Sequence, residues 1–246
     1  MLDKIIVKEN SIAILGYHSG SAGQTETWIE DATGYHLACF VHNVDSNNWN
    51  GVDSETENSR RNSKKMDFPT RDSFKGRPLI ASLDWIKHLK DLGINKVLPL
   101  TNGNRTRLQL IQDCISNNIE LITAIHPTAT IMPEVEIENG TWIGPRCHIG
   151  YKTQIHTGVM MVQGAMIGQH NIIERCAEIH TGAITTGNVT IGECATINAG
   201  ATVIPRIEIG NDVIIGAGSV VLENVAPNHT AVGIPARVIK RIPPDK

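Results

Sequence analysis

The second half of the chain repeats a pattern of hydrophobic and polar positions every six residues. From residue 126 the sequence divides without a gap into sixteen units of six, which end at Val221. The sixth position is Ile, Val or Met in fifteen units, with Thr185 as the exception, and the fourth is small or β-branched almost throughout. Positions four and six share one face of a strand, because side chains alternate along it. A helix would need apolar residues three and four apart, so the pattern predicts short strands.

The six-residue period also predicts how these strands stack. Three strands make one turn of a prism, so residues 18 apart lie above one another and the inward positions form ladders. A β-sandwich would instead show turn signals about every 8–12 residues. The spacing alone leaves the handedness of the coil open. Glycine opens several units, where we expect the chain to turn sharply; these residues are Gly144, Gly150, Gly168, Gly192, Gly210 and Gly216.

The N-terminal half follows a different pattern. Residues 11–15 are a short apolar run that predicts a buried strand, and a glycine-rich turn follows at 16–23. A helix-like stretch at about 24–31 and a second strand at 36–41 complete one strand–helix–strand unit. Backbone N–H groups in such a turn suit phosphate binding. Glycine-rich turns after strands are nevertheless common, and the strict dinucleotide-binding pattern is absent.

A polar excursion at 46–78 interrupts this half, and it is either solvent-exposed or closes over a phosphorylated ligand. Its basic cluster consists of Arg60, Arg61, Lys64 and Lys65.

Strands and helices alternate again after the excursion. Order returns at 79–82, and we expect helices at 84–92 and 104–116 and strands at 96–100 and 120–125. Ser82 would cap the first helix, while Leu108, Ile111 and Ile115 would share one face of the second. Alternating strands and helices predict a parallel sheet.

Composition narrows the classes of function. The chain has 246 residues and a formal net charge of −3, so nothing indicates a nucleic-acid surface or a membrane patch. The five cysteines are odd in number and lack CxxC spacing, which indicates reduced thiols in a cytoplasm. There is no apolar run typical of a signal peptide and no stretch of 18 apolar residues. We therefore expect a cytoplasmic protein without nucleic-acid or membrane partners.

The segment after the repeat resembles the end of a known family. Residues 223–228 (ENVAPN) and 231–240 (AVGIPARVIK) are similar to the closing segment, DVP…VGxPAK, of the hexapeptide-repeat acyltransferases, which form left-handed parallel β-helices. Some members use the prism as a scaffold, and others hold zinc through three histidines. The repeat contains histidines at 126, 148, 156, 170 and 180, without the close pairing of those zinc sites. No metal is expected.

The junction between the two halves resembles one branch of this family. Residues 125–129 (IHPTA) are similar to the IHPSA junction of the sialic-acid O-acetyltransferase-like branch, which includes N-acetyltransferases of nucleotide-linked 4-amino sugars. The resemblance implies a Rossmann-like α/β domain with a parallel sheet at 1–124, which binds a nucleotide sugar. A left-handed β-helix acyltransferase domain with its closing segment would follow at 125–246.

Family members hold the sugar nucleotide with the first turn and with two acidic residues at the end of the second strand. In this chain His42 and Asn43 replace the two acidic residues. The substrate-binding positions implied by the resemblance are Gly16, Tyr17, His18, Ser19, His42 and Asn43.

The resemblance also implies where the chemistry takes place. In these enzymes a histidine followed by an acidic residue removes a proton from the sugar amine or hydroxyl as it attacks acetyl-CoA, at subunit boundaries of a trimer. A gap-free match to the family segment TGAVIDHDCIIGDFVHIAPGA puts Gln169 at the position of this histidine, and His170 follows it. Either the turn at 168–171 differs and His170 is the base, or His170 is a surface residue and Gln169 only hydrogen-bonds the acceptor. We favour the first, because His170 lies outside the inward positions of its unit.

The same match implies residues for the acyl donor. Glu178 takes the place of a second family histidine near the acetyl group, and His180 lies two places on. The expected backbone contacts to CoA are Gly187, Ala199 and Ala217. His156 and Glu174, which are 18 apart, are a fallback acid–base pair or an ion pair between coils.

These observations together predict a cytoplasmic, homotrimeric acyltransferase. It would move an acetyl group from acetyl-CoA to an amine or hydroxyl of a nucleotide-linked sugar. The alternative is a non-catalytic homologue that binds a ligand or partner.

Overall fold

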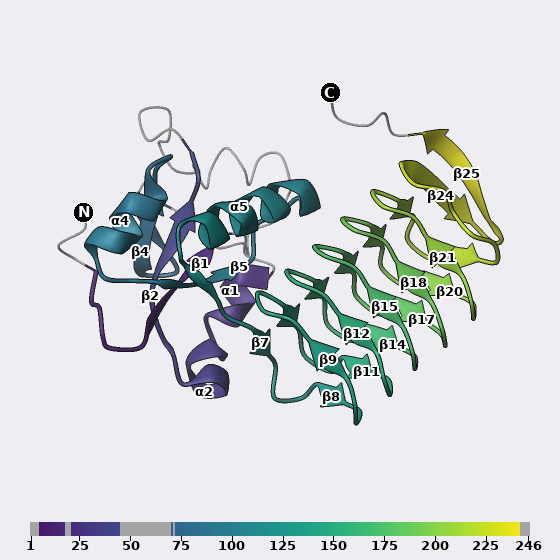
Figure 1. Ribbon diagram of the computed structural model, residues 1–246, viewed down its shortest axis with the longest axis horizontal. Helices are drawn as coiled ribbons and strands as arrows, with labels where there is room; N and C mark the ends of the chain where they lie inside the picture. Colours follow the sequence, from purple (N-terminus) through teal and green to yellow (C-terminus); the bar gives the residue numbers. More distant parts are fainter. Residues whose placement is uncertain (1–4, 18–20, 45–69, 71, 242–246) are drawn as a thin grey trace. The chain divides into compact units, whose positions relative to one another are not determined.

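The computed structural model describes residues 5–17, 21–44, 70 and 72–241 (Figure 1). It divides into two compact units. The first comprises Met1–Asn102 and Leu110–Ile122, and the second comprises Gly103–Gln109 and Thr123–Lys246. The basic cluster of the polar excursion lies outside the described residues.

A six-stranded sheet forms the centre of the first unit, in the order β3-β4-β2-β1-β5-β6. All of its pairs are parallel except β3 with β4. Because β1 pairs with β2 on one side and with β5 on the other, the strand order reverses at β1, the kind of position where open α/β sheets bind ligands. The strands are β1 (Ser11–Leu15), β2 (His36–His42), β3 (Ser73–Phe74), β4 (Arg77–Ala81), β5 (Lys96–Pro99) and β6 (Glu120–Leu121).

Two short helices replace the single helix expected at 24–31. They are α1 (Ser21–Thr25) and α2 (Ile29–Thr33), and α2 ends at Gly34, whose φ is +73°. The hydroxyl of Thr27 donates to the carbonyl of Gln24 at 2.7 Å. This local bond competes with the helical ladder, as threonine hydroxyls commonly do.

The other two helices lie close to their predicted positions, with two corrections. They are α4 (Trp85–Asp91) and α5 (Asn104–Ser116). Ser82 is not the N-cap of α4, because Asp84 holds that position and Ser82 accepts the Asp84 N–H from outside the helix at 3.0 Å. On α5, Ile115 is 60% exposed, whereas Cys114 is fully buried in its place. The strand expected at 120–125 is also interrupted, because it is divided between β6 and β7.

The second unit is a parallel β-helix whose three sheets are stacked coil upon coil (Figure 1). Each coil strand occupies positions five and six of a unit and pairs with the strand 18 residues away, as predicted. The first sheet contains β7 (Ala124–Ile125), β10 (Trp142–Ile143), β13 (Met160–Met161), β16 (Glu178–Ile179), β19 (Thr196–Ile197), β22 (Ile214–Ile215), β24 (His229–Gly233) and β25 (Ala236–Arg241). The second contains β8 (Thr130–Ile131), β11 (His148–Ile149), β14 (Met166–Ile167), β17 (Ile184–Thr185), β20 (Thr202–Val203) and β23 (Val220–Val221). The third contains β9 (Glu136–Ile137), β12 (Gln154–Ile155), β15 (Ile172–Ile173), β18 (Thr190–Ile191) and β21 (Glu208–Ile209).

Three corners connect these sheets. The chain passes from the first sheet to the second at the first corner, from the second to the third at the second corner, and from the third back to the first at the third corner. The closing segment forms β24, which pairs with β22, and β25, which runs antiparallel to β24.

The sixth position of each unit points into the prism and supplies most of its core. Met161, Ile179 and Ile197 are fully buried there, one above another. Thr185 is the exception in the structure as in the sequence. Its hydroxyl oxygen is buried and, among the residues that the structure describes, has no hydrogen-bond partner.

The glycines that open units do not have the role we expected. The left-handed turn lies at position three, where φ is positive in every unit from 134 to 218, whereas the position-one glycines lack positive φ. They are required because successive coils approach closely. A Cβ on Gly150 would lie 2.5 Å from the carbonyl carbon of Gly168, and one on Gly168 would lie 2.5 Å from that of Thr186. Glycine at position one therefore permits coil-to-coil contact rather than a sharp turn.

Candidate active site

The turn at 168–171 forms the second corner between β14 and β15, and it carries both candidate catalytic residues. His170 is exposed and occupies the left-handed position three, with φ at +55°. Its ring lies 5.7 Å from the ring of Tyr151 and nearly perpendicular to it. The Tyr151 hydroxyl donates to Oε1 of Glu134 at 2.7 Å. The imidazole of His170 is thus accessible to solvent and makes an edge-to-face contact with the Tyr151 ring.

Gln169 is also exposed, and it extends towards the following coil. A Cβ added to Gly187 would lie 2.6 Å from Nε2 of Gln169, so the carboxamide occupies the space that a side chain at 187 would need. The backbone of Gln169 accepts the N–H of Asn188 at 2.9 Å. Gln169, His170 and Gly187 therefore belong to one cluster at the second corner.

The other residues expected at the acyl donor lie at the first corner or beside it. Glu178 is on β16 of the first sheet, and Nε2 of His180 lies 3.4 Å from its Oε1. Ala199 and Ala217 are exposed at position two of units that are stacked one coil apart. Within one chain, these four residues and His170 are on different corners of the prism, so a single chain does not bring them together.

The fallback pair is not formed as we expected. His156 binds Glu138, one coil earlier, with 2.9 Å between Nδ1 and Oε1. The other carboxylate oxygen of Glu138 accepts the backbone N–H and the hydroxyl of Thr157. The hydrogen bond from the Thr157 hydroxyl is the main cause of the lowered pKa of Glu138, which lies below 4.5. The carboxylate partner of His156 is therefore Glu138 in the preceding coil, and not Glu174 in the following one.

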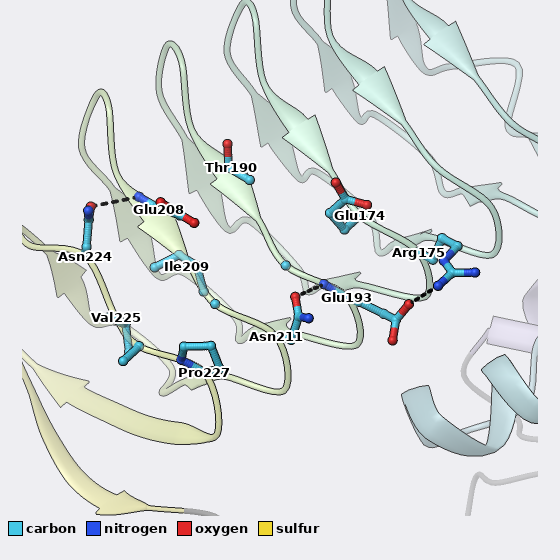
Figure 2. A pocket seen from close by; sticks show the side chains of 13 residues that line it. Glu174, Arg175, Thr190, Glu193, Glu208, Ile209, Asn211, Asn224, Val225 and Pro227 are labelled. Carbon is cyan, nitrogen blue, oxygen red and sulfur yellow. Dashed lines mark hydrogen bonds and ion pairs between the residues drawn. The ribbon is translucent and has the colours of Figure 1, made fainter. Parts of the chain in front are cut away.

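Glu174 lines a hollow of about 700 Å³ along the third sheet and third corner (Figure 2). Glu193 and Glu208 also line it, and Arg175 binds Glu193 with 2.6 Å between Nη2 and Oε2. Arg105 also binds Glu193, so among the described residues Glu174 and Glu208 are the lining carboxylates without an ion pair. The residues expected to contact CoA lie outside this lining.

In the first unit, the described substrate candidates gather at the carboxyl ends of β1 and β2. Gly16 has φ at +124°, and a Cβ there would lie 2.7 Å from the carbonyl oxygen of Leu100, so only glycine fits beside β5. The rings of Tyr17 and His42 are 4.6 Å apart, and burial lowers the pKa of His42. Asn43 is exposed. His18 and Ser19 lie outside the described residues.

Three residues near the candidate sites were not identified from the sequence. Phe74 of β3 lies 6.3 Å from the Tyr17 ring and 5.0 Å from the Phe40 ring. At the prism, Tyr151 and Glu134 were missed. Tyr151 sits 18 residues before Gln169 at the same corner, so the repeat itself contained the signal that it would stack beside the candidate turn.

Three further observations limit what the described residues can do. Among them, no group of three or more His, Cys, Asp or Glu side chains is arranged to hold a metal ion. No helix within the described ranges is long and apolar enough to cross a membrane. The five cysteines are all buried as free thiols, and burial raises the pKa of Cys39, Cys114 and Cys194 to about 12.

Comparisons with known proteins agree with the architecture. Residues 188–223 match the family described as bacterial transferase hexapeptide (six repeats). A search of curated proteins finds no match. Among solved structures, a histidine-to-asparagine mutant of perosamine N-acetyltransferase from Caulobacter crescentus, in complex with CoA and GDP-perosamine, has a TM-score of 0.79 at 23% identity, covering 96% of this chain and 99% of that one. The chain thus shares the fold of this N-acetyltransferase along almost its whole length.

Two further structures share this fold along most of the chain. The acetyltransferase domain of PglB from Neisseria gonorrhoeae, in complex with acetyl coenzyme A, has a TM-score of 0.74 at 22% identity, covering 94% of this chain and 100% of that one. WeeI from Acinetobacter baumannii has a TM-score of 0.52 at 18% identity, covering 93% of this chain and 99% of that one. The similarity of fold therefore extends over both units.

Proposed function

We propose that the protein transfers the acetyl group of acetyl-CoA to an amine, or a hydroxyl, of a nucleotide-linked sugar, with His170 as general base. The observation that carries the proposal is the exposed imidazole of His170 at the second corner, beside Gln169 and Gly187, in a chain whose fold matches sugar N-acetyltransferases along almost its full length. The N-acetyltransferase from Caulobacter binds CoA and GDP-perosamine, which supports a nucleotide-linked amino sugar as the acceptor.

In the chemistry assigned to His170, the imidazole takes one proton from the acceptor and then gives it to the departing CoA thiolate. The acceptor nitrogen attacks the thioester carbonyl, a C–N bond forms, and the imidazole takes the proton that the nitrogen loses. The C–S bond then breaks, and the departing CoA thiolate takes up a proton, so the imidazole returns to its neutral form. A positioned histidine base contributes about 10²–10⁴-fold to such a step. A backbone N–H at the site would stabilise the thioester oxyanion.

A homotrimer of left-handed prisms is the assembly that we propose. His170 lies at the second corner, whereas Glu178, His180, Ala199 and Ala217 lie at or beside the first. A threefold arrangement can place the first corner of one prism against the second corner of its neighbour, as closed cyclic symmetry allows. CoA would then lie between two chains, with Gly187 and the two alanines as small residues along its path.

Residues 1–124 are assigned to the nucleotide sugar as a Rossmann-like domain, with the β-helix domain at 125–246. The strand order of the first unit reverses at β1, and Gly16, Tyr17 and His42 lie at the carboxyl ends of strands there. Ligands of open α/β sheets bind at such a reversal. Because His42 and Asn43 replace an acidic pair, we expect hydrogen bonds from neutral groups to the nucleotide at this place.

We place the protein in the cytoplasm, without nucleic-acid or membrane partners. Five buried, unpaired thiols support a reducing compartment.

The experiment is a thiol-release assay with acetyl-CoA and a panel of UDP-, dTDP- and GDP-linked amino sugars. We expect turnover with at least one acceptor, and we expect His170→Asn to lower kcat by 10²-fold or more. His88→Asn on α4 makes the same change in the first unit and should leave kcat unchanged. A His170→Asn variant with a near-normal rate would exclude this base. No turnover with any acceptor would favour a non-catalytic homologue that binds a ligand or partner.

A further inference from the structure

Two polar side chains are buried directly beneath the candidate catalytic turn. At the second corner, the inward position four is occupied by Val135, Thr153, Asn171, Val189 and Ile207 in successive coils. Thr153 and Asn171 are fully buried. At this corner, polar side chains thus replace apolar ones only in the coil that carries His170 and in the coil before it.

Asn171 binds both its own turn and the next coil. Its Nδ2 donates to the carbonyl of Gly168 at 2.6 Å and to the carbonyl of Thr186 at 2.8 Å. Its Oδ1 accepts the backbone N–H of Val189 at 3.0 Å. The carboxamide therefore ties the first residue of the turn to the coil that follows.

Thr153 binds the same turn from the coil that precedes it. Its hydroxyl donates to the carbonyl of Gly168 at 2.9 Å. The backbone N–H of Asn171 points back to this hydroxyl at 3.4 Å. The Gly168 carbonyl thus accepts hydrogen bonds from two buried side chains, and the turn is fixed from both neighbouring coils.

Such an arrangement is not needed for packing. Burying a hydroxyl or a carboxamide costs free energy unless it is fully hydrogen-bonded, and valine or isoleucine fills the same position in the other coils. What distinguishes this coil is its exposed surface, where Gln169 and His170 stand between Gly168 and Asn171. A catalytic group must be held within a fraction of an ångström, since a misplacement of about 1 Å can cost about 10²-fold in rate.

We infer that Thr153 and Asn171 are positioning residues, which fix the turn at 168–171 so that the imidazole of His170 meets the acceptor atom. The inference rests on the proposed function, in which His170 is the base. It predicts that replacing either residue lowers kcat by more than the loss of a buried hydrogen bond elsewhere in the core does.

The chain offers a matched control for Thr153. Thr141 is also fully buried at position four of a unit, and its hydroxyl also donates to the first residue of the next coil, the carbonyl of His156, at 3.3 Å. It lies at the third corner, away from the candidate turn. Thr153→Val and Thr141→Val each remove one hydroxyl of the same kind without a change in volume.

The test measures kcat, both KM values and the urea midpoint for Thr153→Val, Thr141→Val and Asn171→Val in the full chain. We expect Thr153→Val to lower kcat about tenfold and Asn171→Val about 10²-fold, with KM for acetyl-CoA and acceptor within about twofold of the original. Thr141→Val should lower the urea midpoint somewhat less than Thr153→Val, because its hydroxyl makes one longer bond, and it should keep its kcat within about twofold.

The outcomes separate this inference from the proposed function. If His170→Asn abolishes turnover but Thr153→Val and Thr141→Val have the same kcat, the positioning role is wrong and the base assignment stands. If His170→Asn retains the rate, the base assignment fails and the positioning role fails with it. If Asn171→Val does not fold, the comparison of Thr153→Val with Thr141→Val alone tests the inference. Equal rises in KM without a fall in kcat would indicate a binding role and would also overturn the inference.

Discussion

Arg107 on α5 provides a sharp test of how the second unit is held together. Its side chain is fully buried, although arginine is rarely buried unless it is paired. Nε donates to the carbonyl of Gly158 at 2.9 Å, and Nη2 donates to the carbonyl of Cys176 at 2.8 Å. Nη2 also donates to Oδ1 of Asn104 at 3.1 Å. The two carbonyls belong to position three of successive coils at the third corner, so one guanidinium links two coils to the start of α5.

The magnitude follows from the groups that Arg107→Ala would leave without donors. Hydrogen bonds to charged groups contribute about 1.5–3 kcal/mol each, and a buried acceptor left unsatisfied costs about 1–3 kcal/mol. Loss of the bonds to Gly158 and Cys176 should therefore lower the free energy of unfolding by about 3–5 kcal/mol.

Arg105 on the same helix is the matched control. Its guanidinium binds Glu193 and Asp212, and its side chain is 47% exposed. Exposed ion pairs contribute about 0–1 kcal/mol, because water screens them and both side chains lose rotamer freedom. Arg105→Ala should therefore have a much smaller effect than Arg107→Ala, although both remove an arginine from one turn of α5.

Urea unfolding followed by far-UV circular dichroism measures both effects. We expect a clearly lower midpoint for Arg107→Ala and a midpoint close to the original for Arg105→Ala. Equal shifts in the two variants would refute the reasoning, because they would mean that the buried carbonyls do not depend on the guanidinium.

Three further predictions concern the prism. Gly168→Ala should destabilise it strongly, because the new Cβ would lie 2.5 Å from the backbone of Thr186. The control Gly182→Ala meets nothing within 4 Å and should cost only about 1–2 kcal/mol for its positive φ. Thermal unfolding compares the two variants. Thr185→Val should raise the free energy of unfolding by about 1–3 kcal/mol, because it removes a buried hydroxyl without a partner among the described residues. Urea unfolding would show this as a higher midpoint, and an unchanged or lower midpoint would argue against an unsatisfied oxygen. Because the pKa of Glu138 is lowered in the folded state, the ionised carboxylate stabilises the fold above pH 4.5, and this stabilisation is lost as pH falls through the lowered pKa. The difference in unfolding free energy between the original protein and Glu138→Gln should therefore narrow in acid. A difference that stays constant with pH would contradict the shift.

The prism could be predicted from the sequence because its order is local. A period of six determines which residue points inward, and three periods determine its neighbour in the next coil, so pairs such as Trp142 with Met160 follow from counting alone. The role of Gly150 and Gly168 could not be predicted in this way. Position in the repeat says that a glycine is there, but only the distance between coils shows which atoms it must avoid.

Contacts that depend on a choice between neighbours were also beyond the pattern. His156 has a carboxylate at 18 residues on either side, and counting could not decide that Glu138 would be its partner. Likewise, the helix at 104–116 was predicted from its own periodicity, but the burial of Arg107 depends on carbonyls more than 50 residues away. Long-range contacts of this kind have no local signal.

The candidate site was predictable only in part. The match of 163–183 to the family segment located the turn with Gln169 and His170, and the structure makes that turn an exposed corner. The polar residues at position four were visible as exceptions to the repeat, yet their meaning required the bonds of Asn171 to two coils.

The most direct test of the central claim is the distance from the His170 imidazole to the acceptor nitrogen, measured in a crystal structure with CoA and the nucleotide amino sugar. The account predicts a ring nitrogen within about 2.6–3.2 Å of that atom, with the CoA thiol between the second corner of one chain and the first corner of its neighbour. An acceptor bound far from His170, or CoA in the acidic hollow of the third corner, would contradict the account.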